Sequence, residues 1–151
     1  MNQPLASKHP GYTIVVADDE PEVVDLVRII LESEGYRVLD AGDGVQALNQ
    51  IRTHRPDLIL MDMRMPQMTG LGVLDQLAKD PEIQSIPVVM LSVVVTDPDV
   101  RMALERGAIA YLSKPFEVRE LLWMVDRILT MDSAQRQSFR RQMIGSVGRR
   151  D

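Results

Sequence analysis

Five polar side chains of the kinds that handle divalent metals and phosphoryl groups end or follow short apolar segments of this chain. They are Asp18, Asp19, Asp62, Ser92 and Lys114. Three carboxylates held close together repel one another and raise their pKa values unless a cation is present. A hard divalent cation with oxygen ligands, above all Mg²⁺, relieves that repulsion. A lysine beside such a metal adds the positive charge that suits a phosphoryl group.

Each of these residues also has a plainer interpretation. A carboxylate after a strand is often a helix N-cap, Ser92 could cap the helix that follows it, and a single lysine is usually a solvated surface residue. The chemical interpretation therefore requires that the fold bring all five side chains to one place.

The surrounding segments predict such a fold. Apolar runs predict strands at 12–17, 36–40, 57–62, 86–92 and 108–113, and apolar positions at helical spacing predict helices at 22–34, 44–54, 71–79, 98–107 and 117–130. Strict alternation of the two predicts an α/β fold, a doubly wound five-stranded parallel sheet with helices on both faces. Ligands of such sheets bind beyond the carboxyl ends of the strands, where the five polar residues fall. The methionines and Trp123 are expected to pack in the interior.

Length and composition place these elements in one domain at 11–130, after a flexible segment at 1–10. The first residues lack the apolar core of a secretory signal, the chain has no cysteine, and its apolar runs are too short to cross a bilayer. We therefore expect a cytoplasmic protein without a membrane segment.

The charge is unevenly distributed. Residues 11–130 hold 20 acids and 11 bases, whereas residues 131–151 hold five arginines and two aspartates. An acidic body with few aromatic residues argues against direct nucleic-acid binding. The basic tail predicts either an extension of the fifth helix, because Phe139 and Met143 are spaced i, i+4, or a frayed tail or linker.

Four segments together resemble the receiver domain of bacterial two-component response regulators, similar to the chemotaxis regulators. They are VVADDEP at 15–21, LILMDMRMPQMTG at 58–70, VVMLS at 88–92 and GAIAYLSKPF at 107–116. The resemblance covers about residues 11–130, and it implies the flavodoxin-like strand order 2-1-3-4-5.

The resemblance also implies a role for individual residues. Asp62 would be the phosphoacceptor, and Mg²⁺ would be held by Asp18, Asp19, Asp62 and the backbone carbonyl of Arg64. Ser92 and Lys114 would bind phosphoryl oxygens, Tyr111 would be the switch aromatic, and the Lys114–Pro115 bond would be cis.

The function implied is that of a signalling switch rather than an enzyme. A sensor histidine kinase or a phosphotransfer protein would phosphorylate Asp62 in the presence of Mg²⁺, and slow dephosphorylation would follow. Ser92 and Tyr111 would then move and repack the surface of the fourth helix, fifth strand and fifth helix.

Two positions depart from the family pattern. Val93, followed by Val94, stands where the family usually has Ala or Gly, and we expect it, together with an overhanging Arg64, to slow the reaction with small phosphodonors. Ile109 and Ala110 stand where many DNA-binding members carry acids, so their charged dimer interface is not expected, and a homodimer of another kind stays open.

Three alternatives remain. A haloacid dehalogenase phosphatase needs a second acid two positions after the nucleophile, where this chain has Arg64. A flavodoxin-like cofactor binder needs a Ser/Thr/Gly-rich loop after the first strand, where this chain has Asp-Asp-Glu. A degenerate receiver that only binds a partner is disfavoured because every acceptor-site residue is present.

Overall fold

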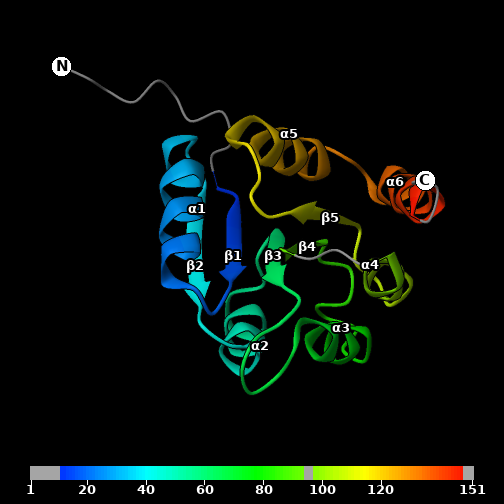
Figure 1. Ribbon diagram of the computed structural model, residues 1–151, viewed down its shortest axis with the longest axis horizontal. Coiled ribbons are helices and arrows are strands. Elements are labelled where there is room, and N and C mark those ends of the chain that lie inside the picture. The colour runs from blue at the N-terminus through cyan, green and yellow to red at the C-terminus, as the bar shows by residue number, and fades with distance from the viewer. Residues whose placement is uncertain (1–10, 94–96, 148–151) are drawn as a thin grey trace.

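Five short strands form one parallel sheet in the order β2-β1-β3-β4-β5 (Figure 1). The computed structural model describes residues 11–93 and 97–147. The strands are β1 (Thr13–Ala17), β2 (Arg37–Ala41), β3 (Leu58–Asp62), β4 (Val88–Ser92) and β5 (Ala110–Ser113). The predicted fold class and strand order are confirmed, and the order reverses between β1 and β3.

Six described helices flank the sheet, and five of them alternate with the strands. They are α1 (Pro21–Ser33), α2 (Gly44–His54), α3 (Gly70–Ala78), α4 (Asp97–Glu105), α5 (Val118–Leu129) and α6 (Ser133–Ser146). Helices α1 and α5 lie on one face of the sheet, and α2, α3 and α4 on the other (Figure 1). The sequence placed these helix and strand limits within about two residues.

Helix α1 shows why these limits could be predicted. Pro21 occupies its first turn, where a missing N–H costs nothing, and Gly35 follows its end with a φ of 94°, which a side chain would disfavour. Strands β1, β3 and β4 are buried on both faces of the sheet and therefore appear as continuous apolar runs, whereas the edge strand β2 exposes Arg37 and Asp40.

Two expectations are wrong. Trp123 does not pack in the interior, because it lies on the outer side of α5 with 55% of its surface exposed. Over residues 131–147 the tail neither extends α5 nor frays, because α5 ends at Leu129 and a separate helix begins at Ser133, and its role as a linker stays a prediction. A reciprocal capping box between Asp132 and Gln135 starts this helix.

Some sequence expectations concern residues outside the described ranges. These are the flexible segment at 1–10, Val94, and the last four residues of the tail. Among the described helices, none combines the length and the apolar composition needed to span a membrane.

Candidate functional site

Two of the predicted acids meet at the point where the strand order reverses. Strands β1 and β3 are neighbours, with Ala17 paired to Met61, so Asp18 and Asp62 lie side by side at the next position. Both carboxylates are buried, with residue exposures of 1% for Asp18 and 8% for Asp62. The backbone N–H of Asp18 donates to the carbonyl of Ala41, which anchors the start of the loop to β2.

Lys114 follows β5 and reaches across to both acids. Its Nζ lies 2.5 Å from Oδ2 of Asp18, 3.4 Å from Oδ2 of Asp62 and 3.6 Å from Oε1 of Glu20. Oδ1 of Asp18 accepts the backbone N–H of Glu20 at 3.0 Å. The structure therefore brings residues 96 positions apart into one ion-paired cluster, as predicted.

The electrostatics of Asp62 and Lys114 differ. Burial raises the pKa of the Asp62 carboxyl, and the charge of Asp18 raises it further, although Lys114 and the backbone N–H of Arg64 partly offset both effects. Burial alone would lower the pKa of Lys114, but its hydrogen bond to Asp18 and the charges of Asp18 and Asp62 outweigh burial and raise it. Lys114 is therefore charged at neutral pH.

The acids form a set that fits a divalent cation. Carboxylate oxygens of Asp18, Asp19, Glu20 and Asp62 all lie within 4.8 Å of one another. Four carboxylates and one ammonium leave an excess of negative charge, and hard oxygen ligands are those that Mg²⁺ binds. Glu20 was not among the predicted ligands, although its position directly after the two aspartates could have drawn attention to it.

The loop after β3 is held close to Asp62. The N–H of Arg64 donates to Oδ1 of Asp62 at 3.4 Å, and the N–H of Gly70 donates to the carbonyl of Met63 at 3.0 Å. A Cβ on Gly70 would lie 2.5 Å from the carbonyl oxygen of Asp62, so only glycine permits this approach. The carbonyl of Arg64 as a metal ligand stays a prediction.

The remaining predicted residues lie on β4 and β5. Ser92 ends β4, next to the strand that carries Asp62, and Tyr111 is in β5, paired with Met90. Ser92 and Tyr111 both line a small void between these strands and α4. The Lys114–Pro115 bond is cis, as predicted.

An apolar groove opens beside the cluster. Its volume is about 280 Å³, and Val23, Leu26, Val93, Pro115 and Phe116 line it together with Glu20 and Lys114. Val93 is 63% exposed, so its side chain stands at the approach to Lys114 rather than in the core.

The sequence of this fold and site matches a known family. Residues 14–126 match the family described as response regulator receiver domain. This chain belongs to the response regulator receiver domain family. It is therefore a receiver domain of the kind found in two-component response regulators. The expected family and fold are confirmed.

Relatives with known names agree with this assignment. The chain is 41% identical over 108 residues to the response regulator GtcR of Aneurinibacillus migulanus, covering 72% of the chain and 43% of that protein. It is 40% identical over 109 residues to the DNA-binding response regulator MtrA of Mycolicibacterium smegmatis, covering 72% and 46%. The chain therefore spans about half the length of these relatives.

Solved receiver domains share the fold. The receiver domain of a sensor histidine kinase from Pseudomonas aeruginosa PAO1, with a magnesium ion coordinated in its active site cleft, superposes with a TM-score of 0.75 at 30% identity, covering 80% of this chain and 99% of that one. The chemotaxis response regulator CheY4 of Vibrio cholerae gives a TM-score of 0.73 at 28% identity, covering 78% and 98%.

Proposed function

We propose that Asp62 of this receiver domain accepts a phosphoryl group from a phosphohistidine of a sensor histidine kinase or a phosphotransfer protein. The observation that carries the proposal is the position of Asp62 at the reversal of strand order, 3.4 Å from the Lys114 ammonium and within the acid cluster. Membership of the family supports the same role.

In the proposed step, a carboxylate oxygen of Asp62 attacks the phosphorus of the phosphohistidine. The new O–P bond forms as the N–P bond breaks, and the histidine nitrogen keeps the electron pair. The ring leaves as a neutral imidazole because its other nitrogen carries a proton in the reacting phosphohistidine. Lys114 and Ser92 donate hydrogen bonds to the phosphoryl oxygens, so their charge and dipole are in place before the reaction. The product is an acyl phosphate.

Asp18, Asp19, Asp62 and the backbone carbonyl of Arg64 are the proposed ligands of Mg²⁺, and we add Glu20 because its carboxylate lies in the same acid cluster. When bound, the ion would neutralise charge on the transferring phosphoryl group. The raised pKa of Asp62 supports this assignment, since burial and the Asp18 carboxylate oppose its ionisation in the absence of a further cation.

The apolar groove beside Lys114 is the proposed route of the partner's histidine. Leu26, Val93 and Phe116 would contact the apolar surface around that histidine. Glu20 and Lys114 also line the groove and belong to the ion-paired cluster around Asp62. In this proposal the receiver domain occupies residues 11–130, works in the cytoplasm as a switch rather than as an enzyme, and does not itself bind nucleic acid. This proposal assigns neither a downstream output nor a homodimer to the receiver domain.

Intact mass spectrometry with acetyl phosphate and Mg²⁺ tests the chemistry. We expect the wild-type chain to gain the mass of one phosphate and Asp62→Asn to gain none. Asp25→Asn, which changes an exposed carboxylate on α1, is the matched control and should react like the wild type. Phosphate added to Asp62→Asn would refute the assignment, because only the acid can form the acyl phosphate.

A further inference from the structure

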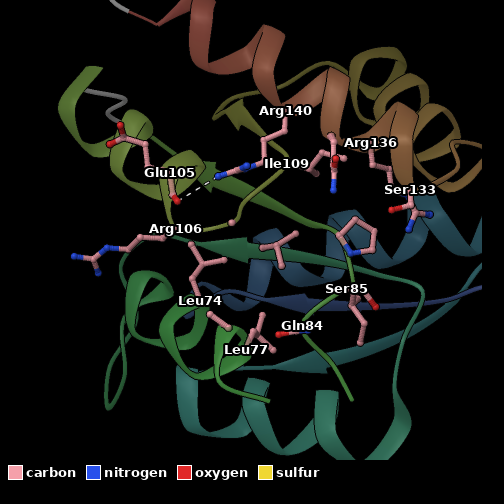
Figure 2. A pocket seen from close by; sticks show the side chains of 16 residues that line it. Leu74, Leu77, Gln84, Ser85, Glu105, Arg106, Ile109, Ser133, Arg136 and Arg140 are labelled. Carbon is pink, nitrogen blue, oxygen red and sulfur yellow. Dashed lines mark hydrogen bonds between the residues drawn. The ribbon is translucent and has the colours of Figure 1, made fainter. Parts of the chain in front are cut away.

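Helix α6 lies outside the residues that match the receiver family, and it binds the ends of two other helices. Arg140 donates from Nε to the carbonyl of Leu104 at 2.7 Å. It also donates from Nη2 to the carbonyl of Glu105 at 3.2 Å, the hydrogen bond that Figure 2 shows. The Nε of Arg136 donates to the carbonyl of Ile128 at 3.2 Å. The last carbonyls of a helix lack partners within it and carry partial negative charge. Two arginines of α6 thus add hydrogen bonds at the C-terminal ends of α4 and α5, where the carbonyls of Leu104 and Ile128 also accept the backbone N–H groups of Gly107 and Met131.

Apolar contacts also hold α6, on the face that carries Arg136 and Arg140. Phe139 and Met143 pack against the core between the sheet and helices α1 and α5. Met143 and Ile144 also pack against the core between the sheet and α2, α3 and α4, and Val147 at the end of the helix is buried there. Helix α6 therefore covers β5 where the two cores adjoin (Figure 1).

A groove of about 700 Å³ remains between α6 and the α3 side of the domain (Figure 2). Its three arginines are already engaged by the protein, since Arg106 pairs with Asp75 at 3.1 Å and Arg136 and Arg140 bind the helix carbonyls. We therefore assign no ligand to this groove. The groove instead leaves open space beside α6 into which this helix can move.

Helix α4 is held from two sides. Its residues Val100, Ala103 and Leu104 are buried in the core beside the sheet, and Arg140 of α6 binds the carbonyls of its last turn. The void beneath α4 is lined by Ser92 and Tyr111 and, along the helix, by Asp99, Val100, Ala103 and Leu104, and its volume of about 10 Å³ has room for about one water molecule. Helix α4 is thus held at its last turn by Arg140, while its face toward Ser92 and Tyr111 is packed incompletely.

We propose that phosphorylation of Asp62 weakens the docking of α6 on α4 and α5. This inference rests on the proposed function. Ser92 lies five residues before α4 begins and Lys114 directly follows β5, so donation to a phosphoryl group draws both segments toward Asp62. Arg140 binds the last carbonyls of α4, at the opposite end of the helix from Ser92. A shift of α4 toward Asp62 therefore improves its contacts near Asp62 and weakens its contacts with α6. Such coupling is reciprocal, so weakening α6 also favours phosphorylation.

Hydrogen exchange of the full chain tests the proposal, with the extent of phosphorylation read from intact mass after treatment with acetyl phosphate and Mg²⁺. We expect amides of residues 133–146 to exchange faster in the phosphorylated chain, and to be unaffected by the same treatment in Asp62→Asn. At the same concentrations of acetyl phosphate and Mg²⁺, Arg140→Ala should reach a higher ratio of phosphorylated to unphosphorylated chain, by about fivefold or more if the coupling is of the usual size. Arg141→Ala, which removes the exposed neighbouring arginine, should reach the wild-type ratio.

The outcomes separate this inference from the function on which it rests. A phosphorylated chain whose α6 exchanges no faster overturns the inference and leaves the proposed function standing. A wild-type chain that gains no phosphate overturns the proposed function and this inference with it. If Arg140→Ala does not fold, Arg136→Gln replaces it, with the same higher phosphorylated fraction expected, and an unchanged fraction would count against the proposal.

Discussion

At the scale of single residues, Lys114 offsets the repulsion between buried carboxylates. It contacts Asp18, Asp62 and Glu20, while its own side chain is almost wholly buried. Removing one partner from such a cluster leaves the others as uncompensated buried charges.

Lys114→Gln is therefore expected to lower the free energy of unfolding by about 3 kcal/mol in metal-free buffer. Urea denaturation measures this loss, and Lys79→Gln, at an exposed lysine after α3, should change little. Adding Mg²⁺ should recover part of the lost stability, because a cation again lies among the acids. A loss that Mg²⁺ does not reduce would count against the metal site.

Asp62→Asn is expected to stabilise the metal-free protein at neutral pH. The pKa of Asp62 is higher in the folded protein than in the unfolded chain, so its stabilising contribution is complete at low pH and is lost as the pH rises through the folded value. The ionised carboxylate thus opposes folding at pH 7, and the neutral amide does not.

Thermal melting checks this expectation, since each kcal/mol corresponds to about 2 to 4 °C in a chain of this length. The difference between Asp62→Asn and the wild type should be smallest near about pH 3, where even an unperturbed aspartate is largely protonated. Equal melting temperatures at pH 7 would contradict the buried repulsion.

Val93→Ala is expected to accelerate phosphorylation by acetyl phosphate several-fold. The exposed valine stands at the groove beside Lys114, and a smaller side chain widens the approach to Asp62. Intact mass followed over time gives the rate, and Val45→Ala, at an exposed valine on α2, is the control. A rate equal to that of the wild type would show that Val93 does not limit access.

At the scale of elements, the sequence was most informative where strands end. Asp18, Asp62 and Ser92 could be located because buried parallel strands are continuous apolar runs, and the first polar residue after each run marks the carboxyl end. The distances from Lys114 to its partners could not be predicted, because they depend on how far a flexible side chain reaches across three strands.

Helix α6 was missed for a different reason. Its arginines are polar in sequence, but their partners are carbonyls of Leu104, Glu105 and Ile128, which no local pattern reveals. Trp123 was misplaced by the opposite error, since a large apolar residue at helical spacing was taken as interior although α5 turns it outward. The Asp132 and Gln135 pair was the one local signal that could have predicted where α6 begins.

The loop between β3 and α3 gives a prediction at the same scale. Gly70→Ala should cost about 1–3 kcal/mol of stability, since the added methyl group meets the carbonyl of Asp62 and the side chain of Met90. Gly145→Ala is the matched control, because that position in α6 has nothing within 4 Å, and alanine should stabilise the helix by about 0.5–1 kcal/mol. Urea denaturation should show opposite signs for the two variants.

At the scale of the whole molecule, the net charge of −5 and the acid cluster predict a specific response to divalent metal. Mg²⁺ at a hundred times its dissociation constant should stabilise the fold by about 2.7 kcal/mol, provided that it binds only the folded state. Calorimetry in MgCl₂ and in NaCl of equal ionic strength separates this effect from general screening. Asp18→Asn should abolish the difference between the two salts.

The strand β5 has a neighbour, β4, on one side only, and α6 covers the other. The backbone N–H and C=O groups at the rim of a sheet are a template for pairing with strands of other molecules, which is how ordered aggregates begin. A helix that leaves β5 after phosphorylation would uncover this rim together with the apolar residues beneath it. The lifetime of the acyl phosphate would then set how long each molecule can self-associate through this edge. In the unphosphorylated protein, docked α6 would protect the edge of β5 against aggregation.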